Sequence, residues 1–229
     1  MLIKCIIAVS VLMGLGLVFV REIIRFLEWP LIRSGLTTNP AEFLRNLAVA
    51  DPFVIVFKVG FLAGLFAALP LVLYFVGQFV VPALTKKERG YLWPAFVAGA
   101  FMFLAGAACC YYFILPKTLS VSYEFSAYLG WKSEWTIQSY YSFVTQFMIG
   151  MGLAFEVPVL LLCLVKLGVI SNLTLRRFRR HFIVVIFIVA AVITPTTDIL
   201  SLCLVAIPMC LLYEVCVWIA WWMDRSKAR

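Results

Sequence analysis

The sequence predicts an all-α membrane protein with six transmembrane helices. Of its 229 residues, 65% are hydrophobic and only 13% are charged, whereas a soluble domain carries about 25% charged residues. Six apolar stretches, separated by segments with charges or prolines, have lengths that suit membrane-crossing helices. We expect one integral membrane domain over residues 1–229, with spans at roughly 2–20, 53–81, 93–115, 143–167, 182–194 and 199–222.

The first two spans raise separate questions. Lys4 stands before an apolar stretch, as in a secretory signal, but Val20-Arg21-Glu22 has no small-residue cleavage site, so we expect the first span to be retained. The second span contains the small-residue pair Gly60 and Gly64, and the third contains 105–108, Ala-Gly-Ala-Ala. Small residues allow close helix contact. We expect that contact within one subunit rather than in a dimer.

Prolines and length set the fourth to sixth spans apart. Pro158 in the fourth span, like Pro70 in the second, should bend its helix. The uninterrupted apolar part of the fifth, 182–193, makes only about 18 Å of helix against a hydrocarbon core of ~30 Å. Either the bilayer thins there, or 182–199 forms a short hairpin packed on longer neighbours. We expect short fifth and sixth helices.

The distribution of Lys and Arg predicts cytoplasmic termini and an outer cap. Two outer segments, 21–30 and 122–131, mix charged and aromatic residues as interfacial helices do. With the N-terminus inside, the outer side holds six basic residues and the inner side twelve. The inner ones are Lys4, Lys86, Lys87, Arg89, Lys166, Arg176, Arg177, Arg179, Arg180, Arg225, Lys227 and Arg229. The net charge of +8 therefore indicates topology and attraction to anionic lipid rather than nucleic-acid binding.

Catalytic and metal-binding patterns are missing from the sequence. The seven cysteines form no CxxC pair and the single histidine, His181, lies in a basic segment, so no metal site is expected. Neither a GxSxG elbow nor a GxxxxGK[ST] phosphate loop occurs. We expect no catalytic residue, no cofactor and no enzyme activity.

Glu156 is the only charge in the apolar run 147–165. An isolated carboxylate in hydrocarbon costs several kcal/mol unless it is protonated, paired or facing a wet cavity. The sequence therefore indicates a functional use for Glu156.

Several motifs together resemble the TatC family, the polytopic receptor subunit of the twin-arginine protein translocase. The residues that carry the resemblance occur in family order: Asp51-Pro52-Phe53 with Lys58, Ala68-Leu69-Pro70, Pro82-Ala83-Leu84 followed by Glu88-Arg89, Tyr111 before Pro116, Phe155-Glu156-Val157-Pro158, Thr194-Pro195 with Asp198, and Pro208 with Tyr213-Glu214. The resemblance runs from about residue 5 into the sixth span.

The resemblance implies a fold and a function. It implies a concave, glove-like six-helix bundle in a bacterial cytoplasmic (inner) membrane, or in an organellar equivalent. Such a protein binds the twin-arginine signal peptides of folded cargo, forms homo-oligomers, and works with TatA-like and TatB-like single-span partners. Transport in this family is driven by the proton-motive force, in line with the missing phosphate loop.

The resemblance also implies roles for particular residues. Glu88 matches the signal-peptide contact, and carboxylates hold arginine pairs in bidentate, charge-assisted contacts. Phe79, Leu84 and Arg89 match the surrounding surface. The alternative is that Glu88 is a solvated charge paired with a neighbouring Lys or Arg.

Glu156 and Pro158 match the concave face. We expect Glu156 to contact a partner subunit or the inserted signal peptide; the alternative is a protonated side chain bonded to a neighbouring helix. Thr194, Pro195 and Asp198 match the hairpin where a partner docks, although Asp198 is also placed to cap the sixth helix. Lys58 is expected to extend to the outer interface, and Glu214 to balance basic charge.

Three positions depart from the family pattern. The family begins with a segment of the form His-Leu-x-Glu-Leu-Arg whose glutamate also contacts the arginines, and this chain begins instead at Met1-Leu2-Ile3-Lys4. A family tryptophan is replaced at Gly77, and a common hairpin glutamine is Leu202. Two other functions stay open: a proton-coupled solute carrier, although no internal repeat is found, and a membrane scaffold.

Overall fold

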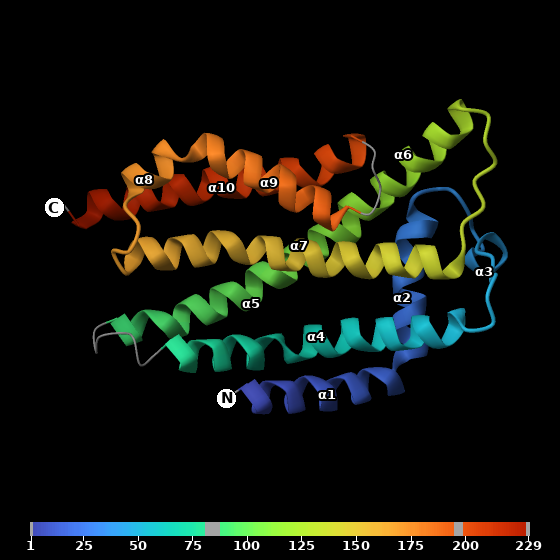
Figure 1. Cartoon of the computed structure of the whole chain (residues 1–229), viewed down its shortest axis with the longest axis horizontal. Helices are drawn as coiled ribbons and strands as arrows, with labels where there is room; N and C mark the ends of the chain where they lie inside the picture. Colours follow the sequence, from blue (N-terminus) through green and yellow to red (C-terminus); the bar gives the residue numbers. More distant parts are fainter. Residues whose placement is uncertain (1, 81–87, 195–198, 228–229) are drawn as a thin grey trace. The chain divides into compact units, whose positions relative to one another are not determined.

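The computed structural model describes residues 2–80, 88–194 and 199–227, and over these ranges the chain is helical without a β-strand. Figure 1 labels the helices. They are α1 (Leu2–Val18), α2 (Val20–Arg33), α3 (Pro40–Phe43), α4 (Asp51–Val80), α5 (Leu92–Cys109), α6 (Leu115–Tyr128), α7 (Ile137–Lys166), α8 (Asn172–Arg177), α9 (Arg179–Ile193) and α10 (Ile199–Lys227). The prediction of an all-α protein is confirmed.

Four described helices are long and apolar enough to cross a membrane. They are Asp51–Phe75, Trp93–Tyr128, Ile137–Lys166 and Ile199–Met223. The first and fifth predicted spans are the shorter helices α1 and α9, of 17 and 15 residues, against the ~20 residues that a span needs. The expectation of a short sixth helix is wrong, because α10 has 29 residues. The orientation of the termini stays a prediction.

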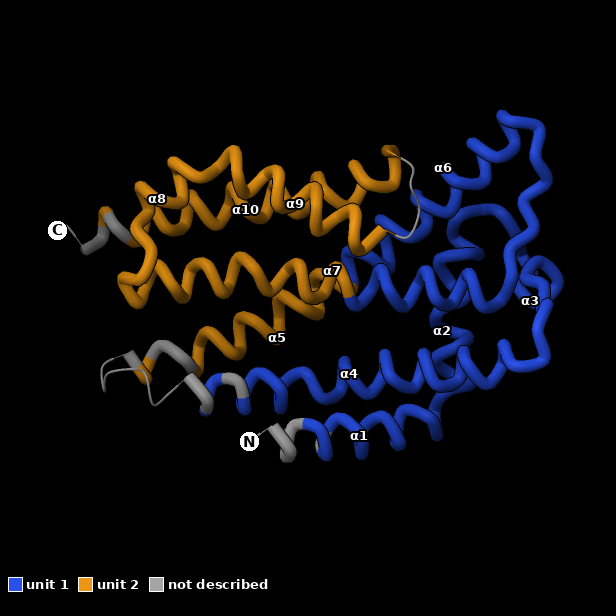
Figure 2. Tube along the Cα trace, in the orientation of Figure 1, with its two compact units in different colours: residues 1–83, 108–149 blue, residues 84–107, 150–229 orange. Residues whose placement is uncertain are grey.

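The chain forms two compact units, which Figure 2 colours separately. Unit 1 contains residues 1–83 and 108–149, and unit 2 contains 84–107 and 150–229.

In unit 1, α1 packs closely on α4 through glycines. A Cβ atom added at Gly64 would lie 2.6 Å from the Cα atom of Met13, and one at Gly60 would lie 2.5 Å from the Leu17 side chain. The contact at Gly64 is with backbone, so this position requires glycine, whereas a side chain at residue 60 would require the end of the Leu17 side chain to move. The expected use of the small residues for packing inside one subunit is confirmed.

The first outer segment forms α2, whose backbone is completed by tyrosines from other helices. Pro30 lies inside α2 and has no N–H to donate to the Phe26 carbonyl one turn earlier. The Tyr111 hydroxyl donates to that carbonyl over 2.6 Å, and the Tyr140 hydroxyl donates to the Leu27 carbonyl over 2.7 Å. Both tyrosines are buried. These bonds attach the outer segment to the long helices of unit 1.

The third predicted span does not end at residue 115. A π-helical turn, Cys110–Ile114, joins α5 to α6, so the helix continues to Tyr128. Pro116 lies in the first turn of α6, and a wider turn before it accommodates a residue that cannot donate to the usual carbonyl. Pro116, before which the sequence predicts the end of the span, therefore lies within the continuous helix.

The fourth span also begins earlier than predicted. α7 starts at Ile137 rather than near residue 143. Thr136 explains the start, because its hydroxyl accepts a hydrogen bond of 3.1 Å from the Ser139 backbone N–H, as N-terminal caps do. Polar residues in this first turn had lowered the local hydropathy.

We predict that Tyr111→Phe lowers the free energy of unfolding by about 1–3 kcal/mol, because it removes the donor of a part-buried hydrogen bond to the Phe26 carbonyl. The measurement is reversible unfolding in detergent micelles. Tyr112→Phe is the matched control, since Tyr112 is exposed and adjacent.

A double-mutant cycle tests the reason for this effect. Pro30→Ala restores a backbone N–H facing Phe26, so the cost of Tyr111→Phe should shrink in that background. An equal cost in both backgrounds would show that the ring packing of Tyr111, rather than its hydroxyl, stabilises α2.

Candidate functional site

The predicted signal-peptide site is only partly within the described residues. Pro82 and Leu84 lie outside them, and the Phe79 and Glu88 side chains are also not described. Glu88 begins the 3-10 turn Glu88–Tyr91, directly before α5, and the following Arg89 is exposed. The roles of these residues stay predictions.

Glu156 lies in the middle of α7, with its carboxylate against α5. A Cβ atom added at Gly99 of α5 would lie 2.8 Å from Oε2 of Glu156. Oε1 is buried and has no hydrogen-bond partner, and Glu156 forms no ion pair with the part of the chain that the structure describes. The alternative in which Glu156 bonds to a neighbouring helix is therefore not supported for Oε1. One acceptor atom is therefore buried without a hydrogen bond from the described part of the chain.

The contact between α5 and α7 fixes this position. A Cβ atom at Gly106 of α5 would lie 2.8 Å from the Met151 carbonyl oxygen, and one at Gly152 of α7 would lie 2.6 Å from the Phe103 ring. Phe103 is fully buried. Gly106 comes seven residues after Gly99, which is two helical turns, so one face of α5 carries both close approaches. The missing side chain at Gly99 leaves space that the Glu156 carboxylate occupies.

Pro158 lies one half-turn beyond Glu156 without interrupting α7. Its carbonyl oxygen accepts a thiol hydrogen bond from Cys216 of α10 over 3.6 Å. This bond connects α7 to α10 near the glutamate. It also assigns a packing role to one of the seven cysteines.

The predicted docking hairpin is described up to Thr194. Thr194 ends α9, is buried, and donates its hydroxyl to the Ala190 carbonyl over 2.6 Å. Its backbone therefore leaves the helix at the expected place. Pro195 and Asp198 lie outside the described residues.

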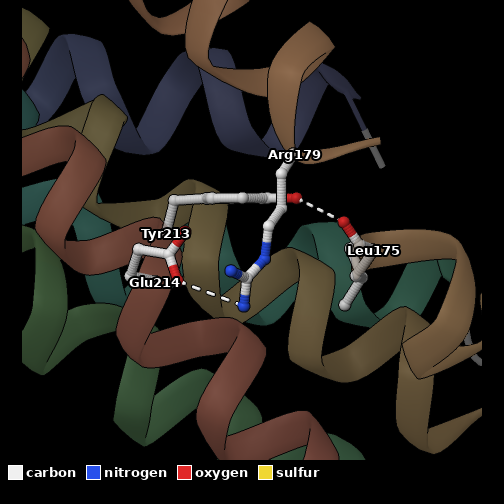
Figure 3. A network of polar contacts seen from close by, with 4 residues as sticks. All are labelled: Leu175, Arg179, Tyr213 and Glu214. Atoms are coloured by element: carbon white, nitrogen blue, oxygen red, sulfur yellow. Dashed lines mark hydrogen bonds and ion pairs between the residues drawn. The ribbon is translucent and has the colours of Figure 1, made fainter. Parts of the chain in front are cut away.

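Glu214 belongs to a polar cluster at the start of α9, shown in Figure 3. Its Oε2 atom lies 3.3 Å from an Nη atom of Arg179, and the adjacent Tyr213 hydroxyl donates to the Leu175 carbonyl over 2.9 Å. The ion pair is about 40% exposed on both sides. Glu214 thus balances a specific arginine of α9, and Tyr213 connects α10 to α8.

The other family-matching residues have structural contacts in unit 1. Lys58 donates to the Ser142 hydroxyl over 2.6 Å rather than only extending to the interface. Pro52 occupies the first turn of α4, after Asp51, whose carboxylate accepts from the Ala48 backbone N–H over 3.2 Å. Pro70 is exposed on α4, which continues through it.

Sequence reasoning missed the partners of these residues. Gly99 carried no signal of its own, because it is one of many small residues in the third span. Ser142 and Arg179 stood out only as ordinary polar residues near helix ends. The bond from Tyr111 to Phe26 could have been expected from Pro30, because a proline inside a helix predicts a nearby donor for the carbonyl four residues earlier.

Comparison with known proteins identifies relatives over nearly the whole chain. A family model described as Sec-independent protein translocase protein (TatC) matches residues 1–208. The TatC protein of Akkermansia muciniphila is 42% identical over 86% of this chain and 57% of its own length. That of Aquifex aeolicus is 32% identical over 99% of this chain and 92% of its own.

A solved structure has the same fold. The crystal structure of the twin arginine translocase receptor TatC in DDM superposes with a TM-score of 0.84 and 31% identity, covering 96% of this chain and 95% of that one. The chain spans little more than half the length of the Akkermansia relative. The long apolar helices and these matches confirm a multi-pass membrane protein of a transport family, and the chain belongs to the TatC family of Sec-independent protein translocases.

Proposed function

We propose that this protein is the receptor subunit of a twin-arginine translocase in the cytoplasmic membrane. It binds the signal peptides of folded proteins and has no catalytic activity of its own. The observation that carries the proposal is the match to the receptor structure over nearly the whole chain, including both helices that place Glu156.

Glu88 is proposed to hold the paired arginines. Glu88 begins the turn directly before α5, and a carboxylate can make two charge-assisted hydrogen bonds to one guanidinium. Phe79 and Leu84 would supply apolar contacts for the signal peptide, beside Arg89. The exposure of Arg89 supports an accessible surface at this turn.

Glu156 is proposed to meet the inserted signal peptide or a partner helix within the membrane. Its Oε1 atom lacks a partner in the described chain, and a polar group supplied by another helix would lower the cost of burying it. Pro158 serves this position through the α7–α10 contact.

The partners are proposed to be TatA-like and TatB-like single-span proteins, and further copies of this chain. Thr194, Pro195 and Asp198 would form the docking hairpin. The outer face of α9 exposes apolar side chains, among them Val184 and Ile188, each 58% exposed, which suits contact with a membrane helix. Transport would be driven by the proton-motive force.

We predict that Glu88→Ala weakens photo-crosslinking of a twin-arginine signal peptide in membranes about tenfold or more, because hydrogen bonds to charged groups contribute roughly 1.5–3 kcal/mol. Glu88→Lys should weaken it further by repulsion. Glu124→Ala is the control, since Glu124 is exposed on α6. Unchanged crosslinking in Glu88→Ala would refute the assignment of Glu88.

For Glu156 we predict that replacement by Gln reduces transport less than replacement by Leu. Gln keeps a polar group that a partner helix can contact, whereas Leu removes it. Transport assays of both variants at matched expression provide the measurement. Equal transport in the two variants would contradict a polar role.

Gly99→Ala should impair transport while leaving stability within about 1 kcal/mol of the wild type, because the atom it meets is the mobile end of the Glu156 side chain. Gly106→Ala is the matched comparison. Its new methyl group meets backbone and Phe155, so it should cost about 1–3 kcal/mol of stability. A Gly99→Ala variant with wild-type transport would show that the carboxylate position is unimportant.

A further inference from the structure

An apolar groove runs along unit 2 between α7, α9 and α10. It has a volume of about 80 Å³. Its lining is almost entirely aliphatic, and includes Ala154, Pro158, Leu161, Val185, Val189 and Met209. Because helices of a membrane protein face acyl chains, such a groove suits part of a lipid tail.

Aromatic rings mark the end of the groove nearest the start of α9. The rings of Phe182 and Tyr213 stack there with centroids 4.8 Å apart. One turn beyond Phe182 lies Arg179, whose charge is already balanced by Glu214. The Arg179–Glu214 pair is therefore electrically neutral. Because Glu214 is paired, its charge does not repel an anion that approaches the other arginines at this end of unit 2.

Two further arginines at this end of unit 2 lie on one indole ring. The guanidinium carbon of Arg225 lies 3.9 Å from the centroid of Trp221, and that of Arg176 lies 5.8 Å from it. Both arginines are exposed, and neither forms an ion pair with a carboxylate whose side chain the structure describes, a set that does not include Asp224. Stacking on an aromatic ring leaves guanidinium N–H groups free for phosphate.

The spacing of groove and arginines suits a phospholipid. Trp221 follows Tyr213 by eight residues of α10, which is about 12 Å of helix, and one leaflet contributes about 15 Å of hydrocarbon. Tryptophan and arginine are typical of the membrane interface, where headgroups lie. Basic pockets between transmembrane helices bind anionic headgroups.

We propose that this part of unit 2 binds one anionic phospholipid, with an acyl chain in the groove and the headgroup phosphate held by Arg176 and Arg225 on Trp221. Attraction of the net-positive chain to anionic lipid needs no particular site. The groove and the stacked arginines specify where one lipid molecule is held.

The test is native mass spectrometry of the full chain in detergent, with equal amounts of phosphatidylglycerol and phosphatidylcholine. The wild type should retain one phosphatidylglycerol in preference to phosphatidylcholine. The double variant Arg176→Gln/Arg225→Gln should lower that retention between about tenfold and thirtyfold, because each basic residue near an anionic lipid surface raises the affinity roughly three- to fivefold. Arg33→Gln is the matched control, since Arg33 also stacks on a tryptophan, Trp29.

The groove is tested separately. Val185→Trp should fill it and reduce phosphatidylglycerol retention, whereas Val215→Trp, which adds the same bulk to an exposed position of α10 outside the groove, should not. Equal retention of both lipids by the wild type, or the same loss in Arg33→Gln as in the double variant, would overturn the proposal. So would a Val185→Trp variant that keeps its lipid but loses contact with a single-span partner, because a partner helix would then occupy the groove.

Discussion

The structure depends on one constraint, that hydrocarbon offers no partner for an unbonded backbone group. Each long helix carries a proline, and each proline removes a donor from the helix around it. In α2 the disturbed carbonyl of Phe26 receives the Tyr111 hydroxyl. Before Pro116 the backbone widens to a π turn instead. The prolines therefore decide which side chains must come from other helices, and the buried tyrosines of unit 1 meet that need.

A second consequence of the same environment is that helix contacts rely on close approach. An apolar side chain gains little free energy by moving from lipid to a contact with another helix, because both surroundings are apolar. Glycines instead increase the contact area by letting the two backbones approach closely. Gly60 and Gly64 do this between α1 and α4. Between α5 and α7 the glycines do something more, because Gly99 and Gly106 lie on one face but meet different atoms. Gly106 meets backbone and ring, whereas Gly99 meets a carboxylate. The packing of α5 on α7 therefore leaves space for the Glu156 carboxylate beside Gly99.

Composition and hydrophobic stretches were enough to predict the fold class and the approximate positions of the spans, because long apolar helices leave a strong signal. The predicted helix boundaries were wrong where local backbone geometry, which hydropathy does not report, sets the end of a helix. The cap by Thr136 starts α7 before the predicted residue, and the π turn lets the helix continue past Pro116. Glu156 was visible in the sequence as a lone charge in an apolar run. Its neighbour Gly99 was not, since the space beside a glycine depends on which helix packs there. Glu88, Leu84 and Asp198 remain sequence predictions.

Glu156 and Glu214, both in unit 2, differ in burial and in pairing. Glu214 is partly exposed and bound to Arg179, so its interaction is complete within the chain and it holds α10 to α9. Glu156 has one oxygen against Gly99 and the other buried without a partner. Removing a paired surface charge changes a local contact, whereas an unpaired carboxylate in hydrocarbon is costly to keep. A chain that needed only stability would gain by replacing Glu156, which is the physical reason for the proposal that Glu156 contacts a second molecule.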